Sequence, residues 1–530
     1  MATTAQTDPP CDPFDQAHAR FGEMIGWLGA AAHEIDHAAI ESKLRERGAE
    51  ILRASYQGHL DQRFERERAA LRAAPPSDTE IRLRTRAVET IFGEVQVRRA
   101  ALTARRERPR TGPRAKTRRG RRVQGVARRE RMPADARLSL PPERYSLPLR
   151  EEVVRQIVEG SYEHAGAAID RQTAGHVPQR QMIQLVERAA QDVEAFYETR
   201  PQPANDTLSS QTLEVMSVDA KGVRMRPEGL REETRKLAAR QARDAVKGDP
   251  MAQRRARTHD RRMAVVIANW EQEPRVRKPE DILRDLRATR TGRPRRVKRT
   301  RRPRKDLPRP LNKQVRASLA HDSREQITEA FAEADRRDPA RARRRVMLVD
   351  GSESQLAHVQ QTASDREVVV TIILDVIHLL HYLWTLSQWL APGDEGVREQ
   401  WVREHLMKLM TRPVAFVVSG LRQAATLRKL RGTDRKAVDD AVNYLEKNAA
   451  YMDYGRYLRA GMPIATGVIE GACRYLVQDR MGITGARWGL DGAEAVLLLR
   501  AVWTSRDWVA FWEFHLRREH ERNYPTAEAA

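Results

Sequence analysis

Two aspartates follow short apolar runs in the C-terminal half of the sequence. Asp219 ends the run LEVMSVD and Asp350 ends the run VMLVD, so each is expected at the carboxyl end of a strand. Carboxyl ends of neighbouring strands in an open α/β sheet meet at one edge, and two carboxylates there repel unless a cation lies between them. Divalent ions with oxygen ligands activate the oxygens of a phosphodiester, so the pair predicts metal-dependent phosphodiester chemistry. Taken singly, either residue is an ordinary strand-to-turn Asp.

A third carboxylate, Glu470, lies in the expected helix GVIEGACRYLVQDRM. It shares one helical face with Arg474 and Gln478, at spacings of four and eight residues. From this face Glu470 could complete the metal site, with Arg474 and Gln478 near a DNA backbone. The alternative is an exposed Glu paired with Arg474, which stabilises a helix only slightly.

The elements that must position these carboxylates follow a definite order. The strand ending at Asp219 is expected to turn tightly at Lys221-Gly222 into a partner strand, and residues 261–272 form a third strand. A fourth strand ends at Asp350, a helix follows, and the fifth strand REVVVTIILD leads into the helix HLLHYLWTLSQWL. This order is that of a ribonuclease-H-like α/β fold, whose first and fourth strands are neighbours.

We divide the chain into six regions by composition and periodicity. The fold class expected is an α/β ribonuclease-H-like catalytic domain with a helical insertion, preceded by a mainly helical basic N-terminal region. The regions are a helical region at 1–80, short strands plus an Arg-rich loop at 81–144, a helix-turn-helix-like region at 145–200, the catalytic domain at 210–390 with an Arg-rich insertion at 275–345, the helical insertion at 391–460, and the Glu-bearing and C-terminal helices at 461–530.

The region at 145–200 has the pattern of a small helical DNA-binding unit. A helix rich in small residues is followed by a turn around Gly175 and a second helix after Pro178. In a helix-turn-helix the second helix would lie in a major groove, whereas a plain helical hairpin shares the same pattern. The expected core residues are Ala165, Ile169, Val177, Ile183 and Val186.

Charge and composition point to nucleic acid as a partner. The formal net charge is +23 and the sequence pI is about 10.5, and neutralising phosphates releases counterions. The most apolar stretch carries Asp375, His378 and His381, so it is better explained as a buried strand and helix than as a membrane span. Cys11 and Cys473 are too few for a disulfide framework or a zinc site. The N-terminus lacks a signal peptide pattern, and we expect a cytoplasmic location.

Five stretches of the C-terminal half carry a family resemblance. They are SVDAKGV, VDGSESQLAHV, ILDVIHLLHYLW, NYLEKNAAYMDYGRYLRAGMPIATGVIEGACRYLVQDRM and GARWGLDGAEAVLLLRAVWTSRDWVAFW. With them the chain resembles insertion-sequence transposases of the ISKra type, within the Mutator-like DDE group. The strong match covers roughly residues 345–515, with weaker support back to residue 80.

The resemblance implies DNA transposition in a bacterial, nucleoid-associated setting. Asp219, Asp350 and Glu470 would be the catalytic triad and hold Mg²⁺ or Mn²⁺. Partners would be double-stranded DNA, as transposon ends with terminal inverted repeats and as target, and further copies of the chain on that DNA. The implied helical insertion after the fifth strand is matched by residues 391–460.

The second catalytic carboxylate has a competitor in Asp375. The Mutator-like group carries a C/D-x-x-H signature downstream of its second catalytic Asp, and Asp375-Val376-Ile377-His378 matches it. We favour Asp350 because the fourth strand adjoins the first. Asp375 and His378 would then contact the metal ligands and orient them, or position the target DNA.

The chain departs from the family in its N-terminal half. Members often carry a cysteine-pair zinc module after the early strands, whereas here VQVRRAALTARRERPRTG has no Cys. We expect no zinc there, and the Arg-rich loop to contact the DNA backbone in its place.

Three residues after the Glu helix are further candidates for DNA contact. Arg480 and Arg487 would clamp phosphates while Trp488 stacks on an unpaired base at the cleavage site. The alternative for Trp488 is a core anchor for the final helix.

The sequence therefore predicts an enzyme that cuts and joins DNA. Two rivals remain open at this point. One is a non-catalytic or domesticated transposase-derived DNA-binding protein, and the other is a ribonuclease-H-fold nuclease that cleaves without strand transfer.

Overall fold

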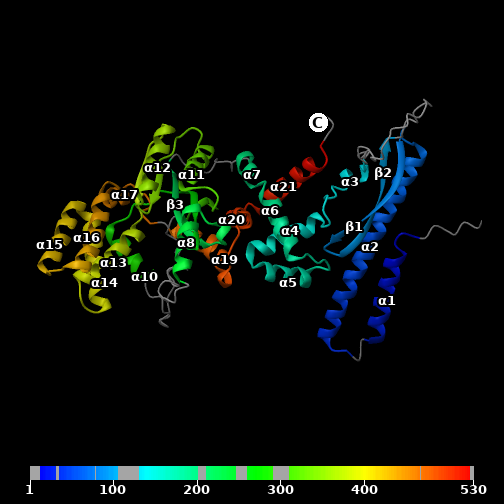
Figure 1. Cartoon of the computed structure of the whole chain (residues 1–530), viewed down its shortest axis with the longest axis horizontal. Helices are drawn as coiled ribbons and strands as arrows, with labels where there is room; N and C mark the ends of the chain where they lie inside the picture. The colour runs from blue at the N-terminus through cyan, green and yellow to red at the C-terminus, as the bar shows by residue number, and fades with distance from the viewer. Residues whose placement is uncertain are drawn as a thin grey trace, which may run out of the picture. The chain divides into compact units, whose positions relative to one another are not determined.

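The computed structural model describes residues 12–31, 35–77, 79–104, 131–200, 211–245, 260–289, 309–465 and 467–525. The chain divides into two compact units. Unit 1 comprises residues 1–192 and 509–530, and unit 2 comprises residues 193–508. Figure 1 follows the chain through both units by colour.

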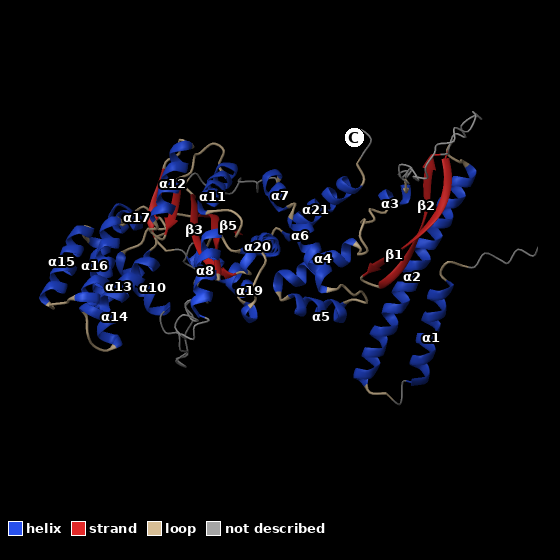
Figure 2. Ribbon diagram, viewed as in Figure 1, coloured by secondary structure: helices blue, strands red, loops and turns tan. Residues whose placement is uncertain are grey.

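A helical hairpin and a β-hairpin begin unit 1. Helices α1 (Asp15–Ala31) and α2 (His37–Ala73) pack together, and strands β1 (Thr79–Thr90) and β2 (Gly93–Ala104) pair antiparallel along their whole length. Figure 2 shows the two strands as a long ribbon beside α2. Their shared core is formed by Leu60, Val88, Val95, Val97 and Leu140. The helical region predicted over 1–80 contains these two helices, and the short strands predicted within 81–144 are formed by β1 and β2.

Helices α4 (Leu147–Glu159), α5 (Tyr162–Gln172) and α6 (Gln179–Ala190) form a bundle. The short helix α3 (Pro133–Arg137) packs on β2, and α21 (Trp508–Asn523) is the last helix of the chain to be described. Ser146 and Ser161 cap α4 and α5 by accepting hydrogen bonds from backbone amides. A triad of Asp192, His515 and Arg522 joins α21 to this bundle, with Asp192 accepting from both partners at 2.7 Å.

The predicted turn and second helix of the 145–200 region are confirmed. The chain turns at Gly175 and α6 begins directly after Pro178. A Cβ at Gly175 would lie 2.5 Å from the Thr90 carbonyl oxygen, so glycine is required there. The expected core residues are buried except Ile183, which is half-buried because Met182 takes the inward position. The Arg-rich loop expected within 81–144 lies almost entirely outside the described residues.

A mixed five-stranded sheet forms the centre of unit 2, in the order β5-β4-β3-β6-β7. Strands β3, β6 and β7 run parallel, and β4 is antiparallel to both of its neighbours. Consequently β5 runs in the same direction as β3. The strands are β3 (Leu213–Arg224), β4 (Arg261–Gln272), β5 (Leu311–Ser318), β6 (Arg345–Val349) and β7 (Val370–Leu374).

The predicted turn at Lys221-Gly222 is wrong, because β3 continues through it as one strand. Its whole length pairs with β4, from Leu213 opposite Gln272 to Arg224 opposite Arg261. The polar run after Asp219 has the composition of a turn, but this pairing keeps the backbone extended. The second strand of the sheet is therefore β4, and Asp219 lies within a strand rather than at its end.

The predicted insertion at 275–345 is wrong in part, since it contains two elements of the domain. Strand β5 forms one sheet edge, and α11 (Ser323–Arg337) packs beside α12 (Glu353–Asp365) on one sheet face. Helix α10 (Pro279–Thr289) also falls in this range. The Pro- and Arg-dense part, over 290–308, lies outside the described residues.

The face of the sheet that carries α11 and α12 has a closely packed apolar core. It includes Met216 and Val218 of β3, Met347 and Val349 of β6, and Phe331 of α11. Successive side chains of a strand point to opposite faces, so Asp219 points away from this core. Helix α20 (Leu490–Ser505) packs against β5, while α7 (Val193–Thr199), η1 (Pro227–Gly229) and α8 (Glu232–Ala245) complete the periphery.

The helical insertion predicted over 391–460 is confirmed as helical. After α13 (Val376–Leu390) it holds α14 (Glu395–Thr411), α15 (Val414–Leu427), α16 (Gly432–Lys447), η3 (Ala449–Tyr451) and α17 (Tyr454–Arg459). Figure 1 shows this group at the end of unit 2 opposite α20. The chain then returns to the sheet through α18 (Gly467–Ala472), the π-helix η4 (Cys473–Gln478), α19 (Asp479–Met481) and η5 (Ile483–Gly485). Among the described residues, no helix has both the length and the apolarity needed to cross a membrane.

Candidate metal centre

The two aspartates expected to form a pair do lie together. Ser217 of β3 pairs with Leu348 of β6, and Asp219 and Asp350 each lie two residues further along parallel strands. His378 joins them from the first turn of α13, the helix that follows the neighbouring strand β7. One ligand atom from each of Asp219, Asp350 and His378 lies within 4.8 Å of the other two. Two oxygens and one imidazole nitrogen in this arrangement can share one divalent cation.

The electrostatics of this group suit a cation. All three side chains are half-buried. Burial raises the pKa of Asp350 above its ordinary value and the charge of Asp219 adds to the rise, while the Ser352 amide and His378 oppose it. Two carboxylates held near each other away from bulk water carry negative charge that a bound divalent ion would neutralise. The group is therefore a candidate site for a divalent cation.

Asp375 contacts His378 but is not one of the three clustered residues. Its Oδ1 accepts a hydrogen bond from the Ile377 amide at 2.8 Å, which makes it the N-cap of α13. Its Oδ2 lies 3.6 Å from Nδ1 of His378, and this contact is the largest cause of the raised pKa of His378. Buried to 4% exposure, Asp375 thus orients the histidine, and Asp350 takes the position beside Asp219.

The loop that follows Asp350 is held by the helical insertion. The hydroxyl of Tyr444 on α16 donates to the Asp350 carbonyl oxygen at 2.6 Å. Gly351 has φ +86°, and a Cβ there would lie 2.8 Å from the same hydroxyl. The left-handed backbone and the close approach both require glycine. Tyr454 donates similarly to the Leu374 carbonyl oxygen at 3.0 Å, one residue before Asp375.

Cys473 contacts Asp219, one member of this group. Its thiol donates to Oδ2 of Asp219 at 3.3 Å, and burial together with the Asp219 charge raises the thiol pKa. The cysteine opens the π-helix η4, which packs on β3. Such π-helical segments are frequent at functional sites.

Glu470, the expected third carboxylate, is not brought into ligand distance of this group. It is exposed on α18 and contributes no atom to the cluster of Asp219, Asp350 and His378. It does lie near enough for its charge to act on the Cys473 thiol. Glu470 therefore stands at the rim of the site, one helical turn before Cys473.

The residues predicted to contact DNA fall into two classes. Arg474, Gln478 and Arg487 are exposed and so available to a phosphate backbone. Arg480 and Trp488 are buried, at 2% and 7% exposure, with the guanidinium 4.8 Å from the indole centroid. Trp488 Nε1 donates to the Met481 carbonyl oxygen, and its backbone bridges Met225 at the end of β3. The burial of Arg480 contradicts its predicted contact with phosphate in this conformation. Trp488 takes the alternative role, that of a core residue.

Sequence reasoning missed the contacts made by Cys473 and Tyr444. The signal for Cys473 was its place three residues after Glu470 on a helix that packs against the Asp219 strand. No local signal marks Tyr444, because its partner lies 94 residues earlier in the chain.

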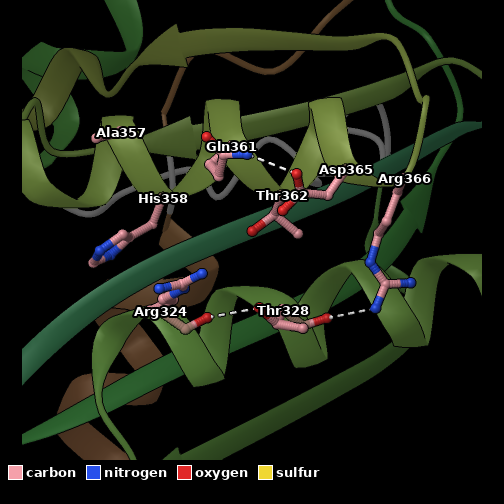
Figure 3. Close-up of a pocket in the computed structure, with 8 residues that line it drawn as sticks. All are labelled: Arg324, Thr328, Ala357, His358, Gln361, Thr362, Asp365 and Arg366. Carbon is pink, nitrogen blue, oxygen red and sulfur yellow. Dashed lines mark hydrogen bonds between the residues drawn. The ribbon is translucent and has the colours of Figure 1, made fainter.

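A polar recess of about 690 Å³ lies between α11 and α12, on the sheet face away from Asp219. Figure 3 shows Arg324 of α11 and His358 of α12 pointing toward each other across it. At its far end Arg366 pairs with Asp335 at 2.6 Å and donates to the Thr328 carbonyl oxygen at 3.4 Å. Its lining offers several donors for an anion, but it has no carboxylate cluster comparable to the metal centre.

Comparison with models of known protein families gives no match, and comparison with curated proteins gives no significant similarity.

Proposed function

We propose that this chain is a DDE-type DNA transposase that cleaves DNA and joins it to a target with the help of divalent metal ions. The observation that carries the proposal is the convergence of Asp219, Asp350 and His378 where β6 and β7 end and β3 continues beyond its pairing with β6. The motif resemblance to ISKra-type transposases supplies the reaction class.

The sheet supports a ribonuclease-H-like catalytic domain. Its strand order is β5-β4-β3-β6-β7, with only β4 reversed, and a helical insertion follows β7 and α13. That is the strand arrangement expected when the first and fourth strands of such a fold are neighbours. The domain would thus present its carboxylates on rigid strands, which suits chemistry that depends on placement.

In the proposed mechanism, Asp219, Asp350 and His378 would hold a catalytic divalent cation. A bound divalent ion supplies activation of the attacking oxygen and stabilisation of the leaving oxygen. Asp375 fixes the imidazole of His378, and Tyr444 fixes the backbone of Asp350. Glu470 stands at the rim, where it can complete the ligand set once DNA and cations are bound.

Exposed basic and polar side chains in both units support DNA as the substrate. Arg474, Gln478 and Arg487 are exposed on the segment that follows Glu470. In unit 1, α6 exposes Gln179, Arg180 and Gln184, which a helix-turn-helix would direct into a major groove. With a formal net charge of +23, backbone binding should be strong and salt-dependent. Joining two element ends would require several copies of the chain on one DNA.

The test is a strand-transfer assay with the purified full-length chain. The substrate is a supercoiled plasmid that carries the coding sequence with its flanking DNA, supplied with Mg²⁺ and a second plasmid as target. We expect cleavage at the element ends and joined products, both lost in Asp219→Asn. Cleavage without joining would indicate a nuclease, and binding without cleavage would indicate a non-catalytic DNA-binding protein.

A further inference from the structure

We propose that Cys473 is a positioning residue of the metal centre, whose thiol fixes the Asp219 carboxylate and docks the Glu470 helix onto β3. This inference rests on the proposed metal-dependent function. It extends that function to a side chain that is not itself among the three converging ligands.

Both oxygens of Asp219 already have partners. Oδ1 accepts a hydrogen bond from the Ala220 amide at 2.7 Å, and Oδ2 accepts from the Cys473 thiol at 3.3 Å. A thiol that faces a carboxylate can serve only as the donor. Held at both oxygens, the carboxylate has one preferred orientation before any cation arrives. Partners of this kind orient metal ligands and lower the cost of binding.

The same contact positions Glu470. Cys473 is 5% exposed and begins η4 immediately after α18, the short helix that carries Glu470. Cys473 is the third residue after Glu470, so both side chains lie within one helical turn. With Cys473 fixed on Asp219, Glu470 is kept at the rim of the centre.

Apolar contacts hold the same segment, so its folding does not rest on the thiol alone. Ala472, Leu476 and Val477 are all buried beside Cys473 and anchor the segment through apolar contacts. Replacing the thiol should therefore alter the metal centre without unfolding the chain. A purely structural role would predict the opposite result, which is loss of stability with unchanged metal affinity.

The experiment measures Mn²⁺ affinity of the full-length chain without DNA, by isothermal titration calorimetry and electron paramagnetic resonance. Cys473→Ser keeps a donor at the same place and should bind Mn²⁺ nearly as well as the unmodified protein. Cys473→Ala removes the donor and should weaken binding by roughly 10-fold or more, as is usual when a partner of a metal ligand is lost. Leu476→Ala is the matched control, since it removes a buried side chain from the same π-helix. It should lower Tm and leave Mn²⁺ affinity unchanged.

The inference is overturned if folded Cys473→Ala binds Mn²⁺ as tightly as the unmodified protein, or if Leu476→Ala loses as much affinity as Cys473→Ala. Absence of Mn²⁺ binding by the unmodified protein would overturn the metal centre itself and this inference with it. Normal binding by the unmodified protein and by Cys473→Ala would overturn the role of Cys473 alone.

Discussion

The hydroxyl of Tyr444 donates a 2.6 Å hydrogen bond to the backbone carbonyl oxygen of Asp350. It thereby connects helix α16 of the helical insertion to the loop that bears the proposed metal ligand Asp350. Tyr444 also stacks on Tyr382 of α13, with ring centroids 3.8 Å apart, so its hydroxyl is held in place.

Removing that hydroxyl should loosen the Asp350 loop. We expect Tyr444→Phe to lose about 1 kcal/mol of stability, the usual contribution of one hydrogen bond, and to weaken Mn²⁺ binding. Thermal unfolding and calorimetric titration measure the two effects. Tyr457→Phe is the control, because its hydroxyl contacts the Ile372 carbonyl oxygen at 3.5 Å, further from the metal ligands. Equal Mn²⁺ affinity in both variants would refute a role for Tyr444 in the site.

Asparagine substitutions should separate the roles of Asp350 and Asp375. Asp350→Asn removes a charged ligand and should abolish DNA cleavage. Asp375→Asn keeps a cap for α13 but weakens the orientation of His378, so we expect roughly a 10- to 100-fold loss, as for other partners of metal ligands. Cleavage rates on the same plasmid substrate decide the matter. Full cleavage by Asp350→Asn together with complete loss in Asp375→Asn would reverse the assignment.

Trp488 should matter to folding rather than to base stacking. Trp488→Ala would empty a buried site and cost about 3–5 kcal/mol, whereas Trp488→Phe retains most of the packing and loses mainly the hydrogen bond to Met481. Denaturant unfolding measures the cost. Folded Trp488→Phe should bind nicked element-end DNA like the unmodified protein, and a large loss of affinity without loss of stability would restore the stacking hypothesis.

Glu214 should make unit 2 less stable as pH rises. Burial raises the pKa of this β3 carboxyl to about 8, against an ordinary value of 4.5, despite the nearby Arg337 and Arg343. The folded chain therefore holds this proton more tightly than the unfolded chain. The resulting stability is complete below about pH 4.5 and is lost as pH rises toward 8.

A glutamine at position 214 cannot ionise and so escapes this loss. We expect Glu214→Gln to be close to the unmodified protein at pH 5 and more stable at pH 8, as measured by Tm. Glu333→Gln is the contrasting variant, since Arg337 lowers the pKa of Glu333 despite its burial. It should lose stability at neutral pH. A constant difference between Glu214→Gln and the unmodified protein across this range would contradict the prediction.

Strands β6 and β7 could be predicted from their apolar sequences: β6 is buried along its whole length, and β7, at the opposite sheet edge from β5, is buried at Ile373 and Leu374. Strands β6 and β7 read as continuous apolar runs, and the turn residues after them mark where Asp350 and Asp375 stand. Strand β5 could not be predicted this way. It lies at the sheet edge, and its sequence LNKQVRAS carries polar and basic residues among the apolar ones.

The pairing of Asp219 with Asp350 followed from strand adjacency, whereas the place of Glu470 did not. Adjacency in a sheet is fixed by backbone hydrogen bonds, so two residues past Ser217 and Leu348 must lie close together. Glu470 depends on how a short helix docks after the 391–460 insertion, and side-chain contacts such as that of Cys473 decide it. The burial of Arg480 against Trp488 is likewise a tertiary contact that helical spacing does not reveal.

The π-helix at Cys473–Gln478 has a consequence for sequence alignment. Its hydrogen bonds reach five residues back rather than four, so the segment holds more residues per turn than an α-helix. A relative in which this stretch is plain α-helix aligns correctly only with a gap inside it. Without that gap, each position upstream is misassigned by about 100° around the helix axis, the rotation of one residue. The predicted shared face of Glu470, Arg474 and Gln478 contains the same error, because it assumes α-helical spacing through the π-helix.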